Sequence, residues 1–183
     1  DGTQTFALAT GTDAAGNAIT AAPTSGATIT VDNTAPTMTI TAANSAGTAV
    51  STGFTTNDTT LALTFTASEA ASTFTLDDIA VNGGTLSSLS ATSTTVYTAT
   101  FTPTGDGAVT IDVAASTFTD DAGNDNTAAT QFNWTYDGTA PIISSISLAS
   151  DNSTIVVTIS EAVYNTDGGS GSLEASDFAL SIS

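Results

Sequence analysis

Apolar side chains alternate with threonine and other polar residues in several short stretches of the chain. The alternation is clearest at positions 38–40, 61–65 and 109–113, where every second side chain is apolar. A period of two is typical of β-strands that bury one face. Further short apolar runs predict strands at 74–76, 79–81, 96–101 and 132–136. Gly, Asn, Asp and Pro separate these runs, and no segment has a helical period, so the sequence predicts an all-β protein.

Three short motifs occur twice in the same order, which indicates an internal repeat of about 105 residues. The repeated motifs are TDAAGN at 12–17 and TDDAGN at 119–124, DNTAP at 32–36 and DGTAP at 137–141, and SEA at 68–70 and 160–162. The shared order is much stronger support for a repeat than any one motif alone.

The repeat divides the chain into three parts. Residues 1–31 correspond to the end of one repeat, 32–136 to a complete repeat, and 137–183 to the first part of another. About seven short strands in about 100 residues are typical of an immunoglobulin-like (Ig-like) Greek-key β-sandwich. We therefore expect tandem Ig-like sandwiches, one complete and two partial, within a longer array. Trp134 and Tyr136 are expected in the core, because Ile29 and Val31 occupy the matching positions.

The charge balance excludes several classes of function. The 183 residues include 18 Asp and Glu but no Lys, Arg, His or Cys, so the formal net charge is −18. Binding to nucleic acid or to an anionic membrane surface depends on basic side chains, and we expect neither. Without His, Lys or Cys most general bases and activated nucleophiles are missing, and we expect no enzyme. No apolar run is long enough to span a membrane, and no signal-peptide pattern is visible at the start.

The three motifs give the chain a resemblance to a known family. The Thr-Ala-Pro linker, the Asp-x-Ala-Gly-Asn loop and the Ser-Glu-Ala segment resemble those of bacterial Ig-like repeats. Such repeats build long surface adhesins and other extracellular stalks, which implies an extracellular or cell-surface location. Similar tandem domains often hold calcium between neighbours.

The positions of the acidic residues agree with that implication. In an Ig-like sandwich the entering linker, the loop after the second strand and the loop before the last strand lie at the same end. Carboxylates brought together repel each other unless they are protonated or bound to a cation. Calcium takes six to eight oxygen ligands in flexible geometry, whereas zinc and copper prefer the absent His and Cys. The expected calcium ligands in the complete repeat are Asp32, Glu69 and Asp120, with Asn33, Asp121 and Asn124 as further candidates.

The repeat predicts two further sites of the same kind. Asp137 and Glu161 would contribute to a site at the next junction, and Asp13 and Asn17 to a site whose linker precedes residue 1. The alternative is purely structural: Asp-Ala-Gly-Asn forms a tight turn in which Asp accepts backbone N–H groups, and proline stiffens the linker.

Together these features predict a structural repeat of an extracellular filament or a surface-adhesin stalk. Its partners would be neighbouring repeats of the same chain or copies of itself. Two alternatives stay open. The chain could be a module that binds a glycan or a host surface, or a polymerising subunit completed by strand exchange between copies.

Overall fold

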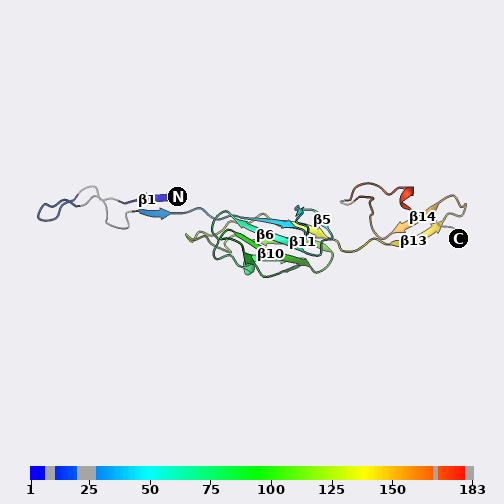
Figure 1. The fold of residues 1–183 in the computed structure, drawn as a ribbon, viewed down its shortest axis with the longest axis horizontal. Helices are drawn as coiled ribbons and strands as arrows, with labels where there is room; N and C mark the ends of the chain where they lie inside the picture. Colours follow the sequence, from blue (N-terminus) through cyan, green and yellow to red (C-terminus); the bar gives the residue numbers. More distant parts are fainter. Residues whose placement is uncertain (7–10, 20–27, 167–168, 180–183) are drawn as a thin grey trace.

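The computed structural model describes residues 1–6, 11–19, 28–166 and 169–179. Near the N-terminus, an antiparallel hairpin is formed by β1 (Gly2–Thr5) and β2 (Thr28–Val31). Near the C-terminus, a second antiparallel hairpin is formed by β13 (Ile143–Leu148) and β14 (Ile155–Ile159). Between them, residues 32–136 form a structure called here the central sandwich. Figure 1 shows the two hairpins beyond opposite ends of this sandwich.

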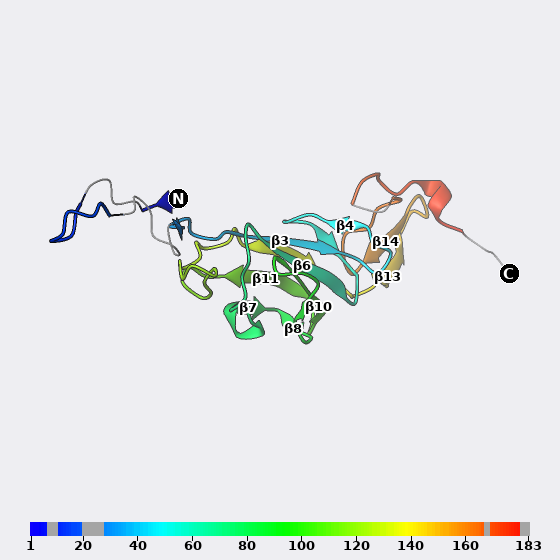
Figure 2. The ribbon, with the colours of Figure 1, turned by 60° about the vertical axis from the view of Figure 1, so that its left-hand side comes forward.

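The central sandwich consists of two sheets (Figure 2). One has the order β4-β3-β6-β10-β8, with β9 also on β10, and the other has the order β5-β12-β11-β7. All of these pairings are antiparallel except that of β5 with β12, which is parallel. The strands are β3 (Met38–Ala43), β4 (Ala49–Val50), β5 (Thr55–Thr56), β6 (Leu61–Ala67), β7 (Ile79–Asn82), β8 (Gly84–Leu86), β9 (Ser90–Ala91), β10 (Val96–Pro103), β11 (Gly107–Val113) and β12 (Phe132–Tyr136).

The alternation in the sequence becomes alternation in burial. Along β6, for example, Leu61, Leu63 and Phe65 are buried, whereas Ala62 faces solvent. Apolar residues of both sheets form one core, in which the rings of Phe101 and Trp134 meet edge to face with their centroids 4.8 Å apart. The expected burial of Trp134 is confirmed. Burial of apolar surface is the main favourable contribution to such a fold.

The predicted strand at 74–76 is wrong. Phe74 ends a turn in which its N–H donates to the carbonyl of Ala71, and Leu76–Asp78 form a short 3-10 helix, η1. Oδ2 of Asp78 accepts the N–H of Thr75 at 2.7 Å and its hydroxyl at 3.1 Å, which caps the start of this helix. That local chemistry outweighs the weak β preference of a short apolar run. The other predicted strands are present. The sequence missed β4, β5, β8 and β9, which have only two or three residues each.

A second 3-10 helix, η2 (Ala175–Asp177), follows the C-terminal hairpin. Within the described residues, no helix is long and apolar enough to cross a membrane.

Candidate metal centre at the domain junction

Three carboxylates from separate segments meet at one end of the central sandwich. Asp32 follows β2 in the linker, Glu69 follows β6, and Asp120 lies in the loop between β11 and β12. One carboxylate oxygen of each lies within 4.8 Å of the others. Asp32 and Glu69 are half-buried, and Asp120 is only 5% exposed. The fold therefore brings together the three residues at the centre of the predicted calcium site.

The loop around Asp120 holds its carboxylate in place through local hydrogen bonds. Oδ1 of Asp120 accepts the N–H groups of Ala122 (2.9 Å) and Asn124 (2.8 Å), and Oδ2 accepts Nδ2 of Asn124 (2.8 Å). Gly123 has φ of +90°, a left-handed conformation that glycine adopts without strain. Nδ2 of Asn124 also donates to the carbonyl of Asp32 at 3.1 Å, which ties the loop to the linker.

The electrostatics of the three carboxyl groups differ. The hydrogen bond from the Asn124 side chain, with further bonds from backbone N–H groups, lowers the pKa of Asp120. Partial removal from water, and then the charges of Asp32 and Asp120, raise the pKa of Glu69. The carboxyl of Glu69 is thus held among negative charges that a bound cation would offset.

The donor set fits calcium. The three groups supply only oxygen atoms, and an oxygen that already accepts a hydrogen bond keeps a second lone pair for a cation. Calcium tolerates the irregular geometry of ligands from three segments, whereas magnesium demands a near-ideal octahedron. Asp32, Glu69 and Asp120 are the residues that would hold the ion.

Two other predicted ligands lie outside this group of carboxylates. Asp121 is exposed, and its Oδ1 accepts the hydroxyl of Ser72 at 3.0 Å. Asn33 is also exposed, and its backbone N–H donates to Oδ1 of Asp1 at 2.7 Å. Asn124 contacts the group through its amide nitrogen, as described above.

At the next junction, Asp137 and Glu161 are both half-buried. Oδ1 of Asp137 accepts the N–H of Thr139 at 3.2 Å, as Oδ1 of Asp32 accepts the N–H of Thr34 at 3.0 Å. Oε1 of Glu161 is buried and has no hydrogen-bond partner among the residues the structure describes. A buried carboxylate oxygen without a donor is costly, and a cation ligand would satisfy it.

The loop at Asp13 reproduces the loop at Asp120. Oδ1 of Asp13 accepts the N–H groups of Ala15 (2.9 Å) and Asn17 (2.8 Å), and Oδ2 accepts Nδ2 of Asn17 (2.8 Å). Asp13 and Asn17 are exposed, so this hydrogen-bond pattern arises without the burial seen at Asp120. The turn is therefore set by local chemistry, as the structural alternative requires, and the convergence with Asp32 and Glu69 is a separate property.

Two residues that support the site escaped the sequence analysis. Oγ of Ser68 accepts the N–H of Thr37 at 3.0 Å, and the N–H of Ser68 donates to the carbonyl of Thr37 at 3.0 Å, which fixes Glu69 against the start of β3. The serine belongs to the repeated Ser-Glu-Ala motif, and this recurrence could have indicated its role.

Asn126 is 2% exposed, and its Oδ1 accepts the N–H groups of Thr117 (2.8 Å) and Phe118 (3.0 Å). No motif points to Asn126, because Ile19 stands at its place in the first repeat.

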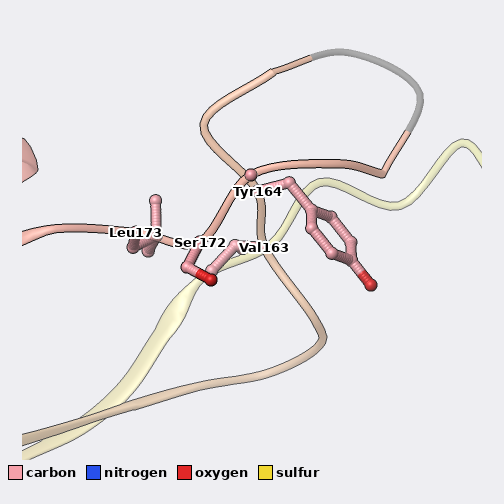
Figure 3. A pocket seen from close by; sticks show the side chains of 5 residues that line it. Val163, Tyr164, Ser172 and Leu173 are labelled. Carbon is pink, nitrogen blue, oxygen red and sulfur yellow. The ribbon is translucent and has the colours of Figure 1, made fainter.

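A hollow of about 420 Å³ lies beside the C-terminal hairpin (Figure 3). Its lining residues are Val163, Tyr164, Gly171, Ser172 and Leu173. By the shared Ser-Glu-Ala motif, Val163 corresponds to Ala71, which is completely buried in the central sandwich. The hollow is thus the uncovered counterpart of a core position, and its shape gives no indication of a ligand.

The two packed sheets and the acidic junction define an Ig-like β-sandwich whose end carries a cluster of carboxylates. The chain belongs to the bacterial Ig-like domain family, whose model matches residues 32–136. This confirms the resemblance drawn from the motifs, and domains of this family are typically non-enzymatic. Neither a curated protein nor a solved structure matches the chain significantly.

Proposed function

We propose that the chain is a structural segment of an extracellular filament or surface-adhesin stalk in which calcium stiffens the junctions between Ig-like domains. Membership of the bacterial Ig-like family supports the role of a structural surface-protein repeat. The observation that carries the calcium proposal is the meeting of Asp32, Glu69 and Asp120 within 4.8 Å. Asp32 belongs to the linker, whereas the other two belong to the sandwich, so an ion bound by all three would fasten the linker to the domain.

The composition makes an external cation the natural partner of these groups. The chain has no Lys, Arg or His, so no basic side chain can neutralise the cluster. The raised pKa of Glu69 and the unpaired Oε1 of Glu161 are what carboxylates placed for a cation would show.

The proposal is tested by calcium titration of the chain followed by thermal unfolding, with Trp134, the single tryptophan, as the fluorescent probe. We expect calcium to raise the melting temperature and chelator to reverse the rise. At a free calcium concentration of about 100 times Kd, the expected stabilisation is about 2.7 kcal/mol. Isothermal calorimetry gives the affinity and the number of ions bound.

The matched variants Glu69→Gln and Asp120→Asn keep the shape of each side chain and remove one charge. Each should weaken calcium binding about tenfold or more, because affinity depends on the number of charged ligands. The control is Asp77→Asn, which removes an exposed charge on η1 and should leave the affinity unchanged. A melting temperature that ignores calcium and chelator, or equal losses in all three variants, would contradict the proposal.

The two alternatives have less support. A glycan-binding module uses exposed aromatic rings. Trp134 and Tyr97 lie in the core of the sandwich, whereas Phe54 and Tyr164 are 53% and 51% exposed. In strand exchange between copies, residues 1–31 of one copy would supply counterparts of β11 and β12. Residues 137–183 of another copy would supply counterparts of β3 to β7. Neither segment carries a counterpart of β10, the strand that pairs with β6. Two copies alone would therefore leave the first sheet divided.

A further inference from the structure

The register of the last two strands places an acidic residue beside each linker. In the β11–β12 pair Gly107 lies opposite Tyr136, so the preceding residue, Asp106, lies beside the start of the following linker. In the β1–β2 pair Gly2 lies opposite Val31, and Asp1 takes the corresponding place. An antiparallel ladder thus brings the carboxylate to the point where the chain leaves the domain.

Asp106 binds two groups of the linker that follows β12. Its Oδ1 accepts the N–H of Gly138 at 2.7 Å, and its Oδ2 accepts the hydroxyl of Thr139. Hydrogen bonds to a charged acceptor are roughly twice as strong as those between neutral groups. The Thr139 hydroxyl and then the Gly138 N–H lower the pKa of Asp106, so the carboxyl group stays ionised at neutral pH.

The same arrangement recurs at the preceding linker. Oδ1 of Asp1 accepts the N–H of Asn33 at 2.7 Å, and Oδ2 accepts the hydroxyl of Thr34. The residue whose backbone is bound differs, Asn33 in one linker and Gly138 in the other, whereas the threonine is the same. The first partner can differ because the carboxylate binds only its backbone N–H, whereas the second partner must supply a hydroxyl group. In both linkers the two carboxylate oxygens accept from one backbone N–H and one threonine hydroxyl, and this recurrence argues against a chance contact of an exposed carboxylate.

The absence of a side chain at Gly138 leaves room for the neighbouring ring of Tyr136. A Cβ at this position would come within 2.5 Å of the hydroxyl oxygen of Tyr136, so the tyrosine ring lies close over the linker. In the other linker Val31 replaces Tyr136, and Asn33 replaces Gly138. The linker at Gly138 is therefore held by the carboxylate of Asp106 and covered by the ring of Tyr136.

We propose that the carboxylate before the penultimate strand, Asp106 and its counterpart Asp1, is a linker clamp that fixes the direction in which the chain leaves each sandwich. The clamp binds the N–H of Gly138 and the hydroxyl of Thr139, whereas the predicted calcium ligands at this junction are the carboxylates of Asp137 and Glu161. The two devices therefore use different groups, and the clamp acts without a cation. It predicts that the junction keeps part of its stiffness in chelator.

The test uses the whole chain in excess chelator, so that calcium has no influence on the result. Hydrogen exchange measured by NMR reports on the Gly138 amide. Pulsed electron–electron double resonance gives the distribution of distances between two spin labels, which reports on the angle of the junction. The chain has no cysteine, so Thr100→Cys on β10 and Ser147→Cys on β13, both exposed, accept the labels uniquely. Asp106→Ala removes both acceptors, Thr139→Val removes only the hydroxyl donor, and Thr139→Ser retains it.

We expect Asp106→Ala to speed exchange at Gly138 by roughly three- to tenfold, as the loss of one hydrogen bond implies, and to broaden the distance distribution. Thr139→Val should broaden it less, and Thr139→Ser and the control Asp77→Asn should leave it unchanged. The melting temperature of the sandwich should stay nearly constant in all variants, because Asp106 is exposed. An unchanged distribution and unchanged exchange in Asp106→Ala would overturn the clamp and leave the calcium proposal standing. The same distance measurement is then repeated with saturating calcium in place of chelator. A wild-type distribution that calcium does not narrow would overturn the calcium proposal and leave the clamp standing.

Discussion

The central sandwich and the C-terminal hairpin carry the same strand pairing with opposite burial. In the sandwich Ile40 lies opposite Phe65, and in the hairpin Ile146 lies opposite Val157. Ile40 is 7% exposed, whereas Ile146 is 65% exposed. In the described part of the chain, β13 is exposed along its whole length and β14 along most of it, and no second sheet covers them (Figure 1).

This difference separates what local sequence achieves from what packing achieves. The reciprocal hydrogen bonds of Ser68 with Thr37 recur between Ser160 and Ile142, at 3.0 and 2.9 Å, although the hairpin lacks a core. The Asp13 loop likewise repeats the Asp120 loop. The turns therefore form from neighbouring residues, and this strand pairing forms without a second sheet, whereas burial requires the opposite sheet.

The largest expected effect comes from truncating a core side chain in one region and its counterpart in the other. Leu63→Ala should cost about 2–5 kcal/mol of unfolding free energy, because it removes a fully buried side chain and leaves a cavity. Ile155→Ala, at the exposed counterpart of Leu63, should change the stability of the central sandwich by less than about 0.5 kcal/mol. Denaturant unfolding followed by Trp134 fluorescence measures both, and equal losses would contradict the difference in burial between the two regions.

A smaller effect is expected at Asn126, which supports the loop that presents Asp120. Asn126→Ala removes the acceptor for the N–H groups of Thr117 and Phe118 and the donor to the carbonyls of Ala114 and Thr127. Leaving such buried groups unpaired should cost about 1–3 kcal/mol.

The same variant tests whether Asn126 supports the candidate metal centre. Asn126 is not a predicted ligand, so weaker calcium binding in Asn126→Ala would come from a loosened loop. Calorimetry checks this, with Asn44→Ala as the control, because the Asn44 side chain also caps a loop, between β3 and β4, but outside the junction. Unchanged stability in Asn126→Ala would contradict the structural role of this residue.

The smallest expected effect is the pH dependence of the calcium-free protein. Because the pKa of Glu69 is raised in the folded state, the folded protein binds its proton more tightly than the unfolded chain does. This contribution to stability is present at low pH and is lost as pH rises through the raised pKa. In chelator, acidification from about pH 7 to about pH 5 should therefore raise the melting temperature slightly.

At lower pH the trend should reverse. The pKa of Asp120 lies below its ordinary value of 3.8, so its contribution is lost as the pH falls through that lowered pKa. Glu69→Gln should abolish only the rise in the upper pH range, and Asp77→Asn should keep it. Identical pH profiles for wild type and Glu69→Gln would rule out the assignment to Glu69.

Much of the site was predictable because it is carried by motifs that recur in order. The convergence of Asp32, Glu69 and Asp120 follows from the loop order of an Ig-like sandwich, and the structure has it. The exposed position of Asp121 was not predictable, because its contact with Ser72 joins two loops distant in sequence. The role of Asp106 was missed because it depends on the register of β11 against β12, and a lone Asp before a strand resembles any solvated turn residue.

The sequence by itself determined the strands with clear alternation, the repeated turns and the excess of negative charge, because these depend on neighbouring residues and on composition. It did not determine η1, where Thr75 and Asp78 cap a turn that a short apolar run disguised as a strand. Only the tertiary structure decided which apolar faces are buried and which carboxylates meet. Both depend on segments that are far apart in the chain and that become neighbours only when two sheets pack together.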